Sequence, residues 1–186
     1  VITELSGIKF RMISASLSFN VSVIKVTLNP KSLNEIIPLK TEAQGTAVVG
    51  WLYLKRISGK TAELFSLSLY IGAAESSCDK KTCRLFWEIG HNIGMAFQII
   101  DDILDYVGTD EEIGKKSGND LKEGIYTLPL ILAMKKNPEV FKVPLEKEKY
   151  EDDDIKNIIN LVKEKGGKDS SVELAKKYST KAVQAG

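Results

Sequence analysis

The segment between Leu52 and Leu128 contains no proline, and its apolar residues recur at intervals of three and four. This spacing places apolar side chains on one face of an α-helix, whereas an amphipathic strand requires alternation. The clearest case is a helix through 83–107 that ends at Gly108. Its predicted buried face consists of Ile89, Ile93, Ala96, Ile100, Ile103 and Val107. We therefore predict an all-α fold from residue 52 onward.

Further helices are predicted toward the C-terminus. A loop rich in Gly, Lys and Asp at 115–124 precedes a short helix over 126–136. Residues 137–154 are predicted to be exposed, and their last three aspartates place favourable negative charge at the N-terminus of the next helix. That helix covers 155–165 and closes at a pair of glycines, and a last helix begins at Ser170.

Length and composition suit one domain. With 186 residues, 43% of them apolar, the chain can bury a sizeable core, so residues 1–186 are expected to form a single domain. Residues 1–50 show mixed strand and loop signals and have no firm assignment, whereas 52–186 carry the helical pattern. The formal net charge of +1 argues against a protein that binds nucleic acid through a strongly basic surface.

The cysteines and the apolar runs indicate in which cellular compartment the protein is expected. Cys78 and Cys83 have no second cysteine pair or histidine cluster near them, which argues against zinc and disulfide frameworks and favours a reducing compartment. No run of about 18 apolar residues is present, and the first residues lack a basic segment leading into an apolar one. We expect a cytoplasmic protein with neither an integral membrane segment nor a secretion signal.

The main chemical feature is a set of aspartates on the helix through 83–107. Asp101, Asp102 and Asp105 are three and four residues apart, so their carboxylates converge on one side, with Gln98 one turn earlier. Like charges at this spacing destabilise a helix unless something neutralises them. Carboxylate oxygens without cysteine or histidine suit Mg²⁺, which takes one or two carboxylates, waters and phosphate oxygens.

The simpler interpretation is a solvated acidic stripe on an amphipathic helix. Two neighbours argue against it: Phe97-Gln98 comes before the aspartates, and a Gly-Lys loop with its own carboxylate, Asp120, comes after them. Lys115 and Lys116 add positive charge in that loop. An anion held by both a metal ion and a lysine would satisfy all these groups.

Four motifs follow one another along this region. They are K-T-A-E-L-F at 60–65, F-Q-I-I-D-D-I-L-D at 97–105, G-K-K-S-G-N-D-L at 114–121 and G-I-Y-T-L-P at 124–129. Together they resemble the motifs of the head-to-tail trans-prenyl (polyprenyl) diphosphate synthases. With a C-terminal helix that is also similar, the resemblance covers about residues 52–186.

The resemblance implies an all-α, isoprenoid synthase-type helical bundle around a central active-site cavity, incomplete in this chain. It also implies a Mg²⁺-dependent prenyltransferase. An allylic diphosphate ionises, the double bond of isopentenyl diphosphate attacks the carbocation, and proton loss yields a longer prenyl diphosphate. Members of this family usually pair, as homodimers or heterodimers.

The resemblance also assigns roles to individual residues. Asp101 would bind Mg²⁺ directly, and the other three aspartates would act directly or through water. Lys60 and Lys115 would hold the allylic diphosphate, with Thr61 and Gln98 near the reacting carbon. The substrate-binding set is Lys9, Arg11, Lys60, Thr61, Phe97, Gln98 and Lys115, and the metal set is Asp101, Asp102, Asp105 and Asp120. In isolation Lys60-Thr61 would be an exposed helical pair.

The chain departs from the family pattern before residue 52. The family's first aspartate-rich motif is not found, since residues 1–50 contain no aspartate. Residues 6–12 resemble an altered copy of the motif that binds isopentenyl diphosphate, with Lys9 and Arg11 as its charged residues. Three hypotheses remain: an active synthase whose first motif lies outside this sequence, a non-catalytic or regulatory subunit of a heterodimer, and a lyase-type terpene synthase. The Gly-Lys loop and the Lys-Thr motif favour the synthase over the lyase.

Overall fold

The computed structural model describes residues 43–107, 117–145, 147 and 149–185, and every regular element in these ranges is helical. In chain order the elements are α3 (Ala43–Ile57), the π-helix η2 (Ser58–Ala62), α4 (Glu63–Glu75), α5 (Lys80–Val107), α7 (Asn119–Lys122), α8 (Leu128–Lys136), α9 (Pro138–Lys142), α10 (Asp152–Glu164) and α11 (Gly167–Ala185). The all-α prediction is therefore confirmed for the described part of the chain.

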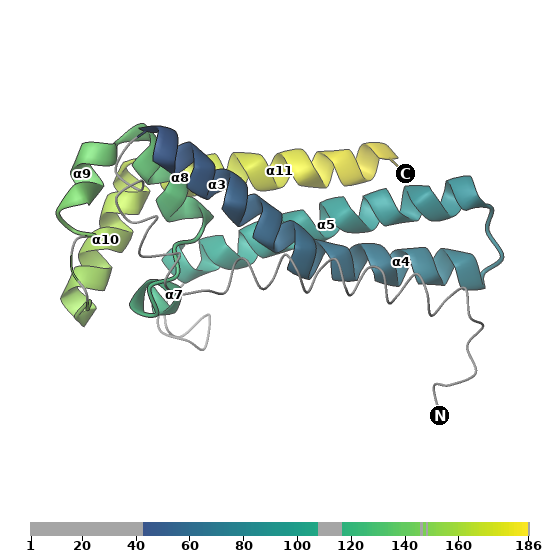
Figure 1. Ribbon diagram of the computed structural model, residues 1–186, viewed down its shortest axis with the longest axis horizontal. Helices are drawn as coiled ribbons and strands as arrows, with labels where there is room; N and C mark the ends of the chain where they lie inside the picture. Colours follow the sequence, from purple (N-terminus) through teal and green to yellow (C-terminus); the bar gives the residue numbers. More distant parts are fainter. Residues whose placement is uncertain (1–42, 108–116, 146, 148, 186) are drawn as a thin grey trace, which may run out of the picture.

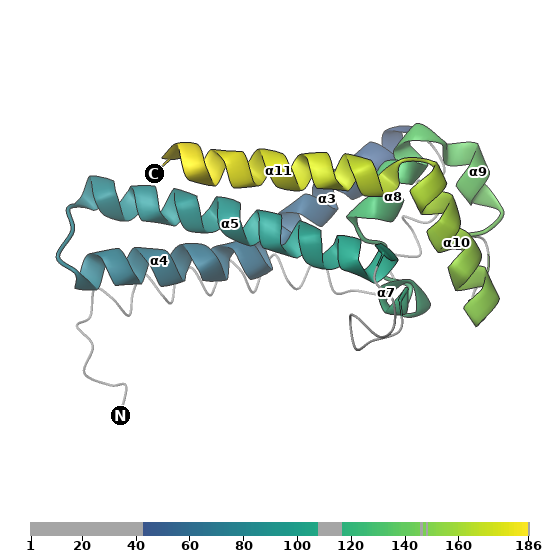
Figure 2. The ribbon, with the colours of Figure 1, turned by 180° about the vertical axis from the view of Figure 1, so that it is seen from behind.

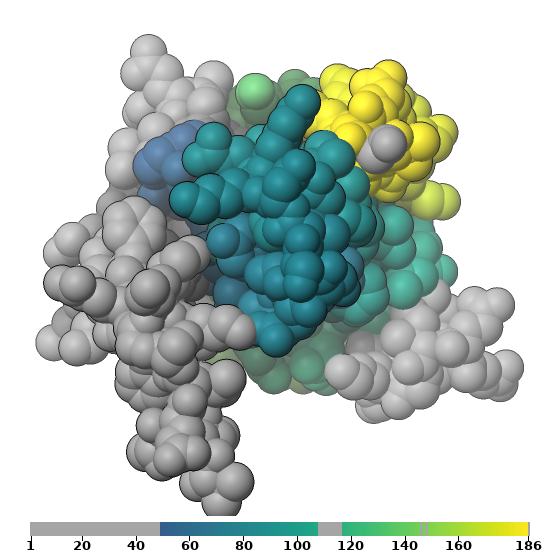
Figure 3. Space-filling view, turned by 90° about the vertical axis from the view of Figure 1, so that its right-hand side faces the viewer, coloured from purple at the N-terminus to yellow at the C-terminus, as the bar shows by residue number. Residues whose placement is uncertain are grey.

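Helix α5 lies at the centre of the bundle. Helix α4 lies along one side of α5, and α11 lies along another (Figures 1 and 2). The same three helices form the end of the molecule at the α4–α5 turn (Figure 3). Helices α3 and α4 are joined by η2 without a loop, and the chain changes direction there (Figure 1). A wide π-helical turn is one of the recognised causes of such a bend.

Two glycines let α5 approach α4 and the preceding η2 closely. A Cβ atom at Gly90 would lie 2.6 Å from the carbonyl oxygen of Phe65, and one at Gly94 would lie 2.5 Å from the Cα of Ala62. These obstacles are backbone atoms, which cannot rotate away as a side chain can. The closeness of α5 to α4 and η2 therefore depends on the absence of side chains at these two positions.

Replacing Gly94 by valine should separate the two helices and destabilise the protein by about 1–3 kcal/mol or more. Gly72 on α4 is the matched control, because a Cβ there would contact nothing. Gly72→Ala should stabilise the helix by about 0.4–1 kcal/mol. Urea unfolding followed by circular dichroism measures both changes. Equal stability of Gly94→Val and the wild type would contradict the close approach of α4 and α5.

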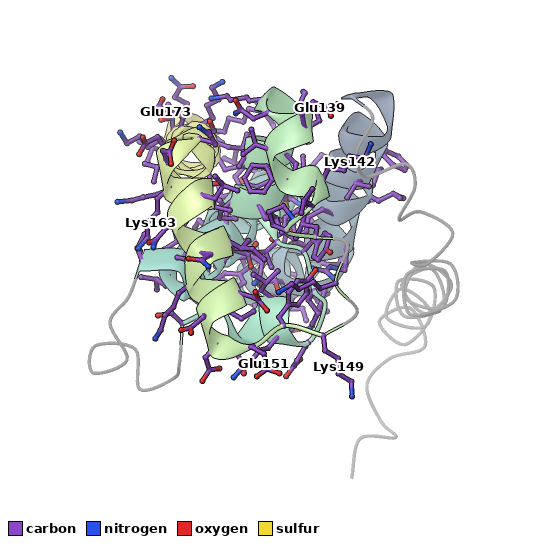
Figure 4. All side chains as sticks on the ribbon, turned by 90° about the vertical axis from the view of Figure 1, so that its left-hand side faces the viewer. Glu139, Lys142, Lys149, Glu151, Lys163 and Glu173 are labelled. Atoms are coloured by element: carbon purple, nitrogen blue, oxygen red, sulfur yellow. The ribbon has the colours of Figure 1, made fainter. Side chains whose placement is uncertain are left out.

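The apolar core has two clusters. The first packs α3 and η2 against α5, α8 and α11, and its buried members are Tyr53, Ile57, Ala62, Met95, Ile99, Ile103, Leu128, Ile131 and Ala175. The second joins the end of α5 to α7–α10, with Tyr106, Leu121, Leu130, Ala133, Met134, Phe141, Ile155, Ile158, Ile159 and Val162. Charged side chains of that end, such as Glu139 and Lys163, lie on the outside of their helices (Figure 4).

The predicted buried face of α5 is wrong in part. Ala96 and Ile103 are buried as expected, but Ile93 and Ile100 are 39% and 47% exposed, and Ile99 is fully buried. The physical reason is that α5 has neighbours on two sides, so its contacts do not follow a single apolar stripe. A stripe of Phe86, Ile93, Phe97, Ile100 and Leu104 is left exposed in the described structure.

The C-terminal helices largely follow the predictions. Asp152, Asp153 and Asp154 form the first turn of α10, and Asp154 accepts the backbone N–H of Glu151 at 3.1 Å in a capping box. The predicted exposure of 137–154 is wrong at α9, where Phe141 is fully buried. The helix predicted over 126–136 is observed as α8, which begins at Leu128, and α11 begins at Gly167 rather than Ser170. That residues 1–186 form one domain stays a prediction.

Candidate active site

The Lys-Thr motif lies in η2, the single π-helical turn between α3 and α4. Such turns are rare and are frequently found at functional sites. Lys60 is exposed and Thr61 is half-buried. The hydroxyl of Thr61 donates a hydrogen bond to Gln98 Oε1 on α5 at 2.7 Å. The fold thus brings together two motifs that are 37 residues apart in the chain.

Gln98 links Thr61 to the aspartates. Its Nε2 donates to Asp101 Oδ2 at 3.3 Å and to Asp102 Oδ1 at 3.2 Å. One side-chain amide thus accepts at its oxygen and donates at its nitrogen, which uses both ends of the group. The result is a continuous polar network that runs from η2 to two carboxylates of α5.

The three aspartates of α5 differ in burial. Asp101 is exposed, Asp105 is half-buried, and Asp102 is only 4% exposed. Asp102 Oδ2 and Asp105 Oδ2 are both buried and accept no hydrogen bond within the described structure. A buried carboxylate oxygen without a partner is costly unless a donor or a cation satisfies it. These two oxygens therefore indicate a place for positive charge.

The pKa values of Asp102 and Asp105 also indicate a place for positive charge. Burial raises the pKa of Asp102 to about 8, and the nearby charges of Asp120 and Asp105 add to this effect. Burial, followed by the charge of Asp120, also raises the pKa of Asp105, although backbone N–H groups at 118–120 oppose the rise. Asp120 thus lies close enough on α7 to repel both carboxylates. A divalent cation among them would relieve that repulsion.

These residues fit a hard cation such as Mg²⁺, with one restriction. No group of three acidic, histidine or cysteine side chains in the described ranges converges closely enough to enclose an ion. Mg²⁺ does not need such a group, because it commonly binds one or two carboxylates and completes its octahedron with waters and phosphate oxygens. The arrangement therefore suits an ion that is shared with a phosphate-bearing substrate.

Arg56 belongs to this region, although the motifs did not predict it. It is half-buried on α3, one turn before Lys60, with its Cζ 5.2 Å from the ring centre of Tyr53. Burial lowers the pKa of Arg56, and attraction to Asp120 opposes that change. Its guanidinium therefore supplies positive charge facing Asp120 from the α3 side. The only sequence signal was its four-residue spacing from Lys60.

Phe97 lies beside the network on the surface of α5. Its ring is 55% exposed and lies 5.5 Å, centre to centre, from the ring of Phe65 on α4. The exposed apolar stripe of α5 extends this surface in both directions along the helix.

The remaining predicted site residues, Lys9, Arg11 and Lys115, lie outside the described residues, as does Lys116.

A family model described as polyprenyl synthetase matches residues 32–162, which is more than half of the chain. The chain belongs to the polyprenyl synthetase family. The resemblance inferred from the four motifs is thereby confirmed.

Individual relatives of this polyprenyl synthetase chain agree with the match. Heptaprenyl diphosphate synthase component 2 of Bacillus subtilis (strain 168) is 36% identical over 132 residues, which cover 71% of this chain and 38% of that protein. The crystal structure of heptaprenyl diphosphate synthase from Staphylococcus aureus matches with a TM-score of 0.76 at 35% identity, covering 97% of this chain and 53% of that one. The chain therefore spans about half the length of its relatives, or less.

A second solved structure of a relative contains bound ligands. Polyprenyl synthase from Caulobacter crescentus CB15, complexed with calcium and isoprenyl diphosphate, matches with a TM-score of 0.69 at 28% identity. That match covers 95% of this chain and 55% of that one. Together with the first structure it confirms the isoprenoid synthase-type fold.

Among the described helices, none is long and apolar enough to cross a membrane. The cytoplasmic location stays a prediction.

Proposed function

We propose that this chain provides the diphosphate-binding half of a Mg²⁺-dependent prenyltransferase active site. The observation that carries the proposal is the network from Thr61 through Gln98 to Asp101 and Asp102, next to carboxylate oxygens that have no partner. A polar network that ends at unsatisfied carboxylates is suited to a cation that itself holds a phosphate-bearing substrate. The proposed reaction condenses an allylic diphosphate with isopentenyl diphosphate.

In the proposed reaction, the carbon–oxygen bond to the allylic diphosphate breaks and leaves a carbocation. The double bond of isopentenyl diphosphate forms the new carbon–carbon bond, and loss of a proton gives the longer prenyl diphosphate. Mg²⁺ would supply charge stabilisation for the departing diphosphate. The exposed ammonium of Lys60 can reach an anion above η2, and we assign Lys115 the same task.

The other site residues position rather than react. Gln98 holds the carboxylates of Asp101 and Asp102 in one orientation through its hydrogen bonds, and Thr61 holds Gln98 in place by donating to its Oε1. We assign Phe97 to the apolar chain of the allylic substrate, because its exposed ring lies next to this network. Lys9 and Arg11 are proposed to bind isopentenyl diphosphate on the strength of their motif alone.

Mg²⁺ and the substrates are supported by chemistry and by one relative. The candidate ligands are all carboxylates, which favour Mg²⁺ or Ca²⁺ over softer metals. The Caulobacter crescentus polyprenyl synthase was crystallised with calcium and isoprenyl diphosphate, which are a hard divalent cation and a substrate of the proposed class. We therefore propose Mg²⁺ with isoprenyl diphosphates for this chain.

A partner chain is the second part of the proposal. Two relatives, from Bacillus subtilis (strain 168) and Geobacillus stearothermophilus, are named component 2 of a heptaprenyl diphosphate synthase. Such a name favours a synthase assembled from different subunits, and a homodimer is the other pairing we consider. The alternative function, a non-catalytic or regulatory subunit, is favoured by the lack of a first aspartate-rich motif in residues 1–50.

Incubation of the full-length protein with Mg²⁺, an allylic diphosphate and labelled isopentenyl diphosphate should yield longer, labelled prenyl diphosphates. The products are separated by chromatography after removal of the diphosphate. Addition of EDTA should abolish the incorporation, and addition of Mg²⁺ should restore it. No incorporation, either alone or with candidate partner subunits, would contradict the enzymatic function and favour the regulatory subunit.

A further inference from the structure

Asp105 contacts the start of α7 through both its backbone and its side chain. Its backbone carbonyl accepts the N–H of Gly118 at 3.0 Å, and its Oδ1 accepts the N–H of Asn119 at 3.3 Å. Helix α7 has only four residues, which is too short to be stable without tertiary contacts. The position of α7 therefore depends on what holds its first residues.

On its other side α7 packs closely against α10. Gly118 has a φ of 77°, in the left-handed region that favours glycine, and a Cβ there would overlap Ile155 and lie 3.0 Å from Ile159 Cδ1. Leu121 is fully buried in the cluster that includes the same isoleucines. The start of α7 is thus confined between the end of α5 and α10.

The contact with Asp105 decides where Asp120 lies. Asp120 follows Asn119 directly on α7, so the hydrogen bonds to Asp105 place a second carboxylate next to the end of α5. Repulsion alone would drive α7 away from α5. The hydrogen bonds from Gly118 and Asn119 to Asp105 oppose that movement.

We infer that Asp105 is a positioning residue, which holds the α7 backbone through Oδ1 and thereby sets the place of Asp120 beside Asp102. The inference rests on the proposed function, because it assigns the metal-facing carboxylates of that site. The two possible roles of Asp105 make different chemical demands. Holding α7 uses Oδ1 as an acceptor, which asparagine retains, whereas direct metal binding would use the unpartnered Oδ2, which asparagine replaces with an NH₂ group.

The test compares Asp105→Asn and Asp105→Ala in the full chain, with Mn²⁺ as the probe ion and inorganic diphosphate present. Loss of a residue that orients metal ligands costs about 10–100-fold in metal affinity, so Asp105→Ala should bind Mn²⁺ at least about tenfold more weakly than Asp105→Asn. Backbone amides of 119–122 should exchange hydrogen faster in Asp105→Ala only. Titration followed by electron paramagnetic resonance and hydrogen-exchange mass spectrometry measure the two effects.

Asp101→Asn is the matched control, because Asp101 is exposed on the same helix and is the proposed direct ligand. It should weaken Mn²⁺ binding more than Asp105→Asn does, with no change in exchange at 119–122. Equal losses in Asp105→Asn and Asp101→Asn would overturn the inference and make Asp105 a direct ligand. The comparison of Asp105→Asn with Asp101→Asn does not need the alanine variant, so it remains decisive if Asp105→Ala does not fold. Neither readout needs turnover, so a failed prenyl-transfer assay leaves this test intact.

Discussion

Replacement of Asp101 by alanine is expected to lower prenyl transfer by about 10²–10³-fold, a loss similar to that of a group that stabilises developing charge in a transition state. Asp101 is exposed on α5, and the hydrogen bond recorded for its side chain is a long one from Gln98 at 3.3 Å. Its removal leaves no cavity and no buried unpaired group. The thermal unfolding midpoint should therefore stay within a degree or two of the wild-type value.

Glu88 provides the matched control for this prediction. It is an exposed acidic residue on the same helix, 13 positions before Asp101. Glu88→Ala should leave both the rate and the unfolding midpoint unchanged, as judged by the labelled isopentenyl diphosphate assay and by circular dichroism. Activity of Asp101→Ala within about threefold of wild type would show that the proposed metal assignment is wrong.

In the metal-free protein, stability is expected to fall as the pH rises from about 4 to about 8, and Asp102 should be a main cause. Burial raises the pKa of Asp102 to about 8, whereas an aspartate in an unfolded chain titrates near pH 3.9. Between these values the folded state holds a proton that the unfolded state has released. Because the folded state binds more protons there, the free energy of unfolding decreases with pH, in total by on the order of a few kcal/mol.

Thermal unfolding in EDTA at several pH values between 4 and 8 measures this effect. Asp102→Asn cannot lose a proton and should remove much of the slope, leaving a smaller part from Asp105, whose pKa burial also raises. Asp153→Asn on the exposed start of α10 is the control and should keep the wild-type slope. A saturating divalent cation should raise the midpoint most near pH 8, where a pKa of about 8 leaves Asp102 partly ionised and able to bind the cation. An unchanged slope in Asp102→Asn would contradict the assignment.

Local sequence patterns predicted most of the helices but not all of their faces. Helix α10 followed from its apolar spacing and three leading aspartates, because capping and dipole effects act within a single turn. The buried face of α5 did not follow, since Ile93 and Ile100 are exposed whereas Ile99 is buried. Periodicity indicates that a helix has an apolar face, but the positions of its neighbours decide which side is covered. Two short helices, α7 and α9, were not predicted, because helices this short are stabilised by tertiary contacts rather than by a local sequence pattern.

The candidate site was also predicted only in part from the sequence. Its membership could be predicted from the motifs at 60–65, 97–105 and 114–121, and the carboxylates on α5 converge because of helical geometry alone. The motifs did not indicate that Arg56 faces Asp120 or that Asp105 holds α7. Those contacts join segments that are distant in the sequence.

The sequence by itself determined the helical class, the family and the acidic character of the site, because each depends on residue type and local spacing. Only the tertiary structure decided that Asp102 is buried with an unpartnered oxygen while Asp101 stays exposed. Burial depends on which helices surround a position, and two adjacent aspartates on one helix point in directions about 100° apart. The same residue type therefore meets water at one position and the core at the next.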